Sequence, residues 1–246
     1  MPFEFALPLA FAIIGLSIAA LLVSIGSRRR AAREEELRQA ASARGWTFEN
    51  SSVRGSRVRR WRGTTDGINW TIESVHRTSG QKGESRRHVT RWFTATSLGT
   101  TTPIFCVGVE PGKEVPSFDM AKGDGWVAQM AQKAAGFALD KAIDVLFGEE
   151  AGRAVDARTL HRVESEAAGF VVMAGDVSEA TRLLFQGLAT ALADINAGPA
   201  DDLTSVLIYQ HGIALARTKQ IEATGDLEIF IRRGIKLTRA STFGRR

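Results

Sequence analysis

The chain has 246 residues, 44% of them hydrophobic and 24% charged, and it carries a formal net charge of +5. This length is enough for one domain with a substantial core, or for two subdomains. The single cysteine, Cys106, excludes an internal disulfide and favours a reducing compartment over a secreted one. Cys106 lies in the apolar run PIFCVGV, which predicts a small core side chain rather than a reactive thiol.

Residues 5–26 form an uncharged apolar run, FALPLAFAIIGLSIAALLVSIG. As a helix, this run would extend about 33 Å, which is enough to cross a hydrocarbon core of about 30 Å. A cleaved signal peptide and a buried soluble helix are the alternatives. A signal peptide would carry positive charge before its apolar stretch, but here Glu4 precedes the run and no Ala-x-Ala site follows it. We therefore predict a transmembrane anchor over residues 1–26.

An arginine cluster follows this run and predicts its orientation. Arg28, Arg29, Arg30 and Arg33 come directly after Gly26. Because arginines beside a membrane span stay in the cytoplasm, the N-terminus is expected outside and the rest of the chain inside. The predicted location is therefore the bacterial inner membrane, crossed once, with a cytoplasmic C-terminal domain.

Residues 27–45 are predicted to continue the helix out of the bilayer as a short juxtamembrane stalk. They are rich in Ala, Glu, Arg, Leu and Gln, which are good helix formers, and Gly45 is placed to end the helix. Glu34 and Arg38 have the i, i+4 spacing of a favourable ion pair.

Residues 46–246 are predicted to form a cytoplasmic α+β domain. Strands are expected, in chain order, at 57–63, 68–77, 88–98, 103–110 and 168–175, followed by a hairpin of 203–210 and 213–220. Amphipathic helices are expected at 125–147, 177–195 and 226–239, with Ser178 as the N-cap of the second. This order favours an antiparallel β-meander with one solvated face, packed with amphipathic helices. If the domain divides in two, the break is expected near 112–122.

Positive charge is concentrated in the first strands of this domain. Residues 46–92 hold ten Lys or Arg against four Asp or Glu, whereas residues 93–246 hold sixteen against nineteen. Anionic lipids attract basic residues near the membrane surface by about 1 kcal/mol each. The residues predicted to contact anionic head groups are Arg28, Arg29, Arg30, Arg33, Arg57, Arg59, Arg60, Arg86 and Arg87.

Two other interpretations of this basic region compete. One is a solvated, arginine-rich outer face of a sheet. The other is nucleic-acid binding, in which Trp61, Trp70 and Trp92 would stack bases between the arginines. The second is disfavoured, because no RNA-binding motif or zinc spacing accompanies the tryptophans.

No motif in the sequence identifies a reaction, a metal or a cofactor. The chain lacks G-x-S-x-G, P-loop, H-E-x-x-H and C-x-x-C patterns. His76 and His88 are expected on neighbouring strands, but no Asp, Glu or Cys stands at ligand spacing beside them, and a zinc site needs three or four ligands. No residue is therefore assigned to catalysis, to a metal or to a cofactor.

Five short segments follow the arginine-rich flank of the apolar run. They are ARGWTFE at 43–49, Trp-x-Gly at 61–63, Gly-x-x-Trp at 67–70, PIFCVGVEPG at 103–112 and Phe-x-Val at 170–172. Together they resemble bacterial single-pass membrane proteins that carry a cytoplasmic α+β domain. The resemblance implies an anchor followed by a domain, and it implies no specific activity.

The sequence therefore favours a non-enzymatic scaffold or adaptor held at the cytoplasmic face of the inner membrane. Its expected partners are anionic lipid and another protein. The alternative is a membrane-bound enzyme with an unfamiliar site in a groove between the sheet and the helices. Convergent polar groups with shifted pKa values in such a groove would favour the enzyme.

Overall fold

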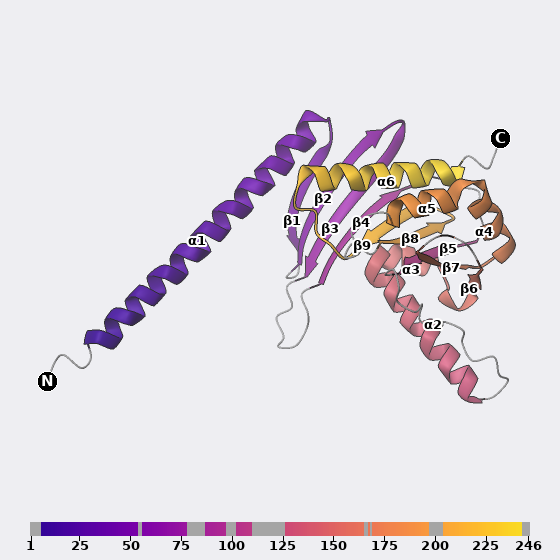
Figure 1. Cartoon of the computed structure of the whole chain (residues 1–246), viewed down its shortest axis with the longest axis horizontal. Coiled ribbons are helices and arrows are strands. Elements are labelled where there is room, and N and C mark those ends of the chain that lie inside the picture. The colour runs from indigo at the N-terminus through magenta and orange to yellow at the C-terminus, as the bar shows by residue number, and fades with distance from the viewer. Residues whose placement is uncertain are drawn as a thin grey trace.

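The structure is a computed structural model that describes the backbone of residues 6–53, 56–77, 87–96, 102–109, 126–164, 167, 169–196 and 204–242. Within these ranges, the side chains of residues 6–20, 22, 26, 87, 126–136 and 196 are not described. The chain forms an α+β fold in which one antiparallel sheet is covered by helices, and a long N-terminal helix extends away from it (Figure 1). The predicted α+β class is therefore confirmed.

The described strands form a single nine-stranded sheet. In chain order they are β1 (Thr47–Val53), β2 (Ser56–Thr65), β3 (Ile68–Arg77), β4 (Arg87–Thr94), β5 (Ile104–Gly108), β6 (His161–Val163), β7 (Phe170–Ala174), β8 (Thr204–Tyr209) and β9 (Gly212–Arg217). Their spatial order is β1-β2-β3-β4-β9-β8-β5-β7-β6, and every neighbouring pair is antiparallel. The predicted meander is confirmed for β2, β3 and β4, but its fourth strand, β5, is separated from β4 by the predicted C-terminal hairpin β8–β9, and the edge strand β1 was not predicted.

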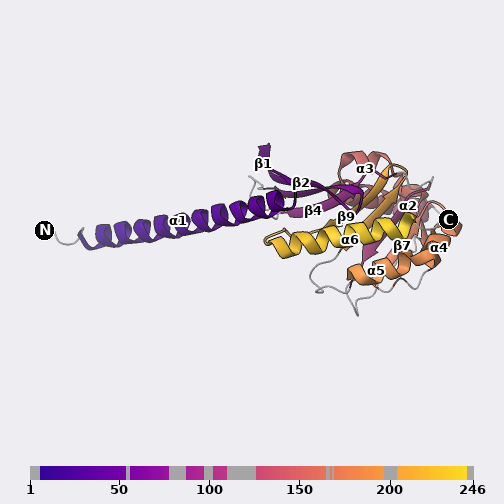
Figure 2. The same cartoon turned by 90° about the horizontal axis from the view of Figure 1, so that it is seen from above.

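Helices cover the sheet from two sides. They are α1 (Ala6–Ala43), α2 (Trp126–Phe147), α3 (Glu149–Arg153), η1 (Ala157–Thr159), α4 (Val177–Leu183), the π-helical turn η2 (Leu184–Leu188), α5 (Ala189–Asn196) and α6 (Thr224–Thr242). Side chains of α4, η2, α5, α6 and the C-terminal end of α1 pack on one face, and those of α2, α3 and η1 pack on the other. Figure 2 shows α3 on one side of the sheet and α5 and α6 on the opposite side.

A row of paired residues crosses all the described strands on the α6 side of the sheet. In strand order these residues are Phe48, Trp61, Ile72, Trp92, Leu215, Val206, Cys106, Val172 and Val163. All except Phe48 are buried. The helix α6 approaches this row closely, because a Cβ on Gly234 would lie 2.3 Å from the indole of Trp92.

The helix predicted over residues 27–45 is confirmed as far as Ala43, but its last turns are not separate from the domain. Residues 27–43 belong to the same helix as the apolar run, and Leu37 and Ala41 are buried in the core against the sheet. Gly45 follows the helix with φ of 70°, a conformation that suits glycine, as expected for a helix end. The last turns of α1 are therefore part of the domain rather than a free connector.

Two local predictions are also wrong. Asp176, not Ser178, caps α4, because its Oδ1 accepts hydrogen bonds from the backbone N–H groups of Ser178 and Glu179 at 2.8 and 3.0 Å. Arg38 pairs with Glu35 at 2.8 Å rather than with Glu34. Glu34 instead has partners on the sheet, which are described below.

The described part of the chain contains no helix that combines the length and the apolar character needed to cross a membrane. The segment near 112–122, where a subdomain break was expected, lies outside the described residues. Strands from both sides of that segment pair within the same sheet.

Candidate functional site: a basic pocket where α1 meets the sheet

The polarity of the α6-side face changes along the strands. Next to the apolar row lies a polar row, in which Ser74 and Thr90 join their hydroxyl groups at 3.1 Å. One further step along the strands, the paired residues become basic. The three rows, read across β2, β3 and β4, are Trp61, Ile72 and Trp92; Arg59, Ser74 and Thr90; and Arg57, His76 and His88. Strand alternation alone therefore brings two arginines and two histidines to one face.

Helix α1 lies over this basic end of the sheet through one stripe of its surface. Arg30, Glu34, Leu37 and Ala41 follow each other at spacings of three or four residues, so they share a side of the helix. The last two are buried in the core, and Glu34 reaches strands β1 and β2. This packing fixes α1 on the sheet and places Arg30 and Arg33 opposite the basic row.

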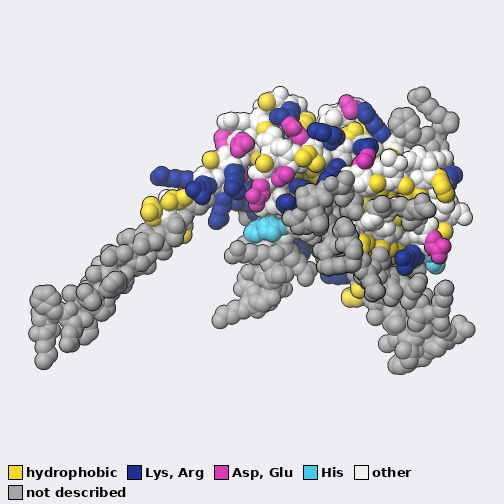
Figure 3. Space-filling view, viewed as in Figure 1, with side chains coloured by type: hydrophobic (Ala, Val, Ile, Leu, Met, Phe, Trp, Pro, Cys, Tyr) yellow, Lys and Arg dark blue, Asp and Glu magenta, His cyan; other side chains and the backbone are white. Residues whose placement is uncertain are grey.

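The two surfaces enclose a cavity of about 320 Å³, which we call the basic pocket. Figure 3 shows Lys and Arg side chains gathered where α1 meets the sheet, with His side chains beside them. The basic pocket is lined by Arg30, Arg33, Arg57, Arg59, His76, His88, Gln220 and Glu222.

Glu34 makes polar contacts that join α1 to the sheet. Its Oε1 lies 3.0 Å from Arg59 Nη2 and 3.2 Å from Arg57 Nη1, and its Oε2 accepts a hydrogen bond from Asn50 Nδ2 at 3.0 Å. The Arg59 side chain is only 9% exposed. A guanidinium at such depth requires a carboxylate partner, and α1 supplies it.

Polar groups in the basic pocket are only partly paired. Arg33 lies 3.5 Å from Glu222, and both side chains are largely exposed. The rings of His76 and His88 stack with centroids 4.2 Å apart. Within the described residues, Arg59 Nε and His88 Nδ1 are buried without a hydrogen-bond partner. The pocket therefore keeps buried donor positions that Glu34 does not satisfy.

The opposite face of the same strands carries a ladder of alternating charge. Glu49, Arg60, Glu73 and Arg91 are paired in sequence across β1 to β4. Arg60 contacts Glu73 and lies 3.7 Å from Glu49. Arg91 donates to the carbonyl oxygens of Leu146 and Val145 at the end of α2, at 2.8 and 2.9 Å. Burial lowers the pKa of Arg91, and Glu73 opposes this shift.

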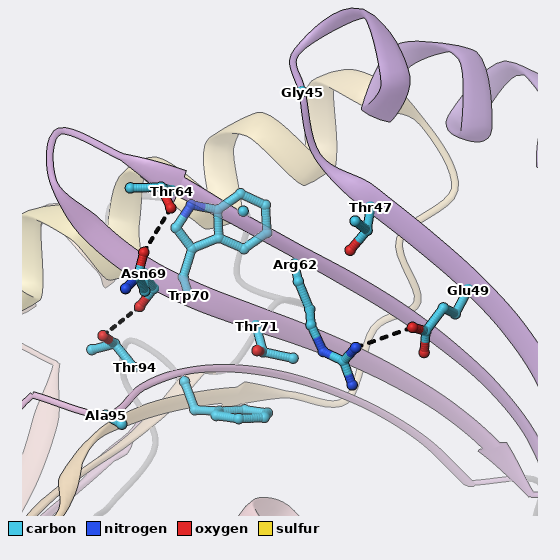
Figure 4. Close-up of a pocket in the computed structure, with 12 residues that line it drawn as sticks. Gly45, Thr47, Glu49, Arg62, Thr64, Asn69, Trp70, Thr71, Thr94 and Ala95 are labelled. Carbon is cyan, nitrogen blue, oxygen red and sulfur yellow. Dashed lines mark hydrogen bonds and ion pairs between the residues drawn. The ribbon is translucent and has the colours of Figure 1, made fainter.

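An open groove of about 610 Å³ lies beside this ladder (Figure 4). Arg62 and Glu49 form an ion pair at 3.0 Å within it. Thr64 donates a hydrogen bond to the Asn69 side chain at 2.6 Å, and Thr94 donates to the Asn69 carbonyl at 2.6 Å. These lining groups thus satisfy one another, in contrast to those of the basic pocket.

The structure brings together four of the nine residues predicted to contact anionic lipid. Arg30, Arg33, Arg57 and Arg59 line the basic pocket. Arg28 and Arg29 are exposed on α1, and Arg60 lies on the opposite face of the sheet. Arg86 lies outside the described residues, and Arg87 begins β4 with a side chain that is not described. His76 and His88 were expected to be neighbours, but their place in the same pocket was missed.

Other residues considered for function in the sequence do not line the basic pocket. Trp61, Trp70 and Trp92 are each no more than 2% exposed, so in this fold they offer no surface for stacking bases. His161 and His211 are exposed. Over the ranges that the structure describes, no group of three or more His, Cys, Asp or Glu is arranged to hold a metal ion.

Among the residues that the structure describes, three groups have clearly displaced pKa values, and none of the three lines either cavity. They are Arg91, Cys106 and Tyr209. Burial raises the pKa of the Cys106 thiol to about 12, and burial, with the charge of Glu150, raises the pKa of Tyr209. The chemistry that the basic pocket offers is therefore attraction and hydrogen bonding of an anion.

Comparison with known proteins found no relative of this chain. No protein-family model, curated protein or solved structure matches this chain. The basic pocket and the arrangement of α1 are therefore the features of the molecule that bear on its function.

Proposed function

We propose that this chain is a membrane-anchored binding domain, a scaffold or adaptor rather than an enzyme. In this proposal the apolar run crosses the inner membrane, and residues 27–246 lie on the cytoplasmic side. The end of the domain that carries the basic pocket rests against anionic head groups. The remaining surface stays open to a protein partner.

The observation that carries this proposal is the continuity of α1. One helix, Ala6–Ala43, contains most of the apolar run at its start and the buried Leu37 and Ala41 at its end. A helix fixed to the sheet in this way would hold the domain at a set height and orientation to the bilayer. Arg30 follows the last residue of the run by four positions, or about 6 Å of helix.

The position of Arg30 along α1 matches the depth of the head-group layer. The polar layer adds roughly 5–7 Å to each side of the hydrocarbon core. Arg30 and Arg33 would therefore lie within it or just beyond it, and the two arginines of β2 lie beside them in the basic pocket. This supports contact between the pocket and anionic lipid, because basic side chains act on the leaflet only at short range.

An enzyme with its site between the sheet and the helices is the alternative. The basic pocket gathers four guanidinium groups and two histidines, and the lining groups of the open groove bind one another. These observations support binding over catalysis as the proposed role.

The test is a topology experiment on the full chain. Alkaline phosphatase, which is active only outside the cytoplasm, and green fluorescent protein, which folds inside, are each fused after Arg246. We expect an inactive phosphatase, a fluorescent reporter and a protein that stays in the membrane after alkaline carbonate extraction. An active phosphatase, or a mature chain that begins after Gly26, would contradict the proposal.

Lipid contact is tested separately by fluorescence quenching on the full chain, reconstituted in vesicles with its C-terminal domain outward. Quenching of a domain-attached dye by labelled lipid is compared between neutral and anionic vesicles at two salt concentrations. We expect closer approach to anionic lipid and a loss of this difference at high salt, because salt screens exposed charge. Equal approach at both lipid compositions would remove the membrane-surface role.

A further inference from the structure

We propose that the basic pocket is a binding site for a phosphate monoester dianion. The inference rests on the proposed membrane-surface function for the source of the ligand, because a lipid head group would present such a phosphate at this height. The chemistry of the pocket itself is independent of that source, since a free phosphate monoester would be bound by the same groups.

The charge balance of the pocket defines the ligand. Four guanidinium groups, on Arg30, Arg33, Arg57 and Arg59, face two carboxylates, on Glu34 and Glu222. The formal excess is two positive charges. A cluster with this excess of positive charge attracts an anion, and a phosphate monoester carries nearly two negative charges at neutral pH.

The hydrogen-bond donors point to an oxyanion with several acceptor atoms. Arg59 Nε and His88 Nδ1 are buried without a partner in the described residues, and Arg59 is 8% exposed. Arg59 donates a hydrogen bond from Nη2 to Glu34, so its Nε remains available to a ligand. His88 donates from Nδ1 in one of its tautomers. Guanidinium groups bind phosphate oxygens with paired, charge-assisted hydrogen bonds.

The size and the entrance of the pocket fit a head group rather than a whole lipid. A volume of about 320 Å³ is at the lower end of small-ligand sites. Arg33 and Glu222 stand at the exposed side, with side chains 59% and 64% exposed. Their ion pair is weak because solvent screens it, so an incoming phosphate can displace Glu222 from Arg33.

The test measures binding to the full chain in nanodiscs through the shift in its unfolding temperature. The three arms are glycerol 3-phosphate added to neutral phosphatidylcholine discs, discs with phosphatidic acid, and discs with phosphatidylglycerol. Phosphatidic acid presents a phosphate monoester and phosphatidylglycerol a diester, and their amounts are adjusted to the same surface potential. A ligand that binds only the folded state raises the unfolding temperature.

We expect stabilisation by a monoester, as glycerol 3-phosphate or as phosphatidic acid, and not by phosphatidylglycerol. Stabilisation by phosphatidic acid alone assigns the ligand to the membrane, and stabilisation by glycerol 3-phosphate alone assigns it to solution. Both results support the pocket. Equal shifts with both lipids and none with glycerol 3-phosphate would overturn the pocket, although the proposed attraction to anionic membranes would stand.

Substitutions test whether residues of the basic pocket bind the phosphate monoester. Arg57→Gln should weaken monoester binding about tenfold, since it removes one charge-assisted contact. Glu222→Gln should tighten binding roughly two- to fivefold, because it removes a competing carboxylate, and misfolding cannot produce tighter binding. The matched control is Arg62→Gln, on the opposite face and paired with Glu49. Equal affinities for Arg57→Gln and Arg62→Gln, or no gain in Glu222→Gln, would overturn the proposal.

Discussion

The two halves of the sheet differ in how many of their faces are covered. In the distal half, formed by β9, β8, β5, β7 and β6, every residue of β7 and β9 is buried. In the proximal half, β1–β4, burial alternates along β3, where Trp70, Ile72 and Ser74 are buried on the α6 side. The distal half thus provides the stable core, and the proximal half exposes polar and charged surface.

One cross-strand row on the α2 side shows where the change occurs. Across β2, β3, β4, β9, β8 and β5 it runs through Arg62, Thr71, Phe93, Ala214, Leu207 and Phe105. The residues become apolar at β4, where α2 begins to contact the sheet. The same row of paired residues is therefore polar or solvent-facing in the proximal half and part of the core in the distal half. The candidate site lies in the proximal half, where polar side chains are tolerated.

The strongest test of this comparison uses the two ends of that row. Phe105→Ala should lower the free energy of unfolding by about 3–5 kcal/mol, because it opens a cavity in a covered face. Phe105 is 1% exposed and packs edge-on against Phe147 with centroids 6.0 Å apart. Arg62→Ala should change the same free energy by less than about 0.5 kcal/mol. Denaturant titration of both variants measures the difference, and equal losses would show that both halves are covered alike.

A second test concerns the contact that holds α1 on the proximal half. Glu34→Gln should lower the free energy of unfolding by about 2–3 kcal/mol, because Arg59 would remain buried beside a neutral partner. Glu36→Gln, an exposed position two residues away on α1, is the matched control and should have almost no effect. Both are measured by thermal unfolding in nanodiscs. A Glu34→Gln chain as stable as the control would mean that α1 is not fixed to the sheet by this carboxylate.

A smaller effect is expected at Cys106 in the distal half. Burial raises the pKa of its thiol from the ordinary 9.0 to about 12, so the unfolded chain ionises first as pH rises. The resulting stability is complete below pH 9 and is lost progressively between pH 9 and pH 12. At pH 10 the loss is on the order of 1 kcal/mol. The slope of stability against pH above 9 should therefore be shallower in Cys106→Ala than in the parent chain, and identical slopes would mean that the thiol reaches solvent.

Much of the distal half could be predicted from sequence, because its elements are strongly patterned. The His211-Gly212 turn between two apolar runs gave the β8–β9 hairpin, and helical spacing placed Leu227, Phe230 and Ile235 inward on α6. The short strand β6 and the polar edge strand β1 were missed. The sequence of β1, TFENSSV, is mostly exposed and has no alternation to detect.

The candidate site could be predicted from the sequence only in part. Pairing of His76 with His88 follows from one hairpin, but their meeting with Arg30 and Arg33 depends on how a distant helix packs. Glu34 shows the same limit. Its local partner at i+4 offers a weak exposed pair, whereas buried Arg59 offers a stronger one that only the tertiary fold creates. Trp61 and Trp92 lie beside arginines in sequence, but tertiary packing buries them, because Gly234 of α6 approaches Trp92 and the ring of Phe48 packs against Trp61.

The most direct test of the account is the depth of the basic pocket relative to the membrane. Cys106 is buried, so a cysteine introduced as Glu222→Cys can carry the only nitroxide label on the full chain in anionic nanodiscs. The account predicts that this label lies in the head-group layer, with reduced access to a water-soluble relaxation agent. A label at Glu149→Cys, in α3 on the other face of the sheet, should remain fully accessible. Equal accessibility at the two positions would contradict a pocket held against the lipid surface.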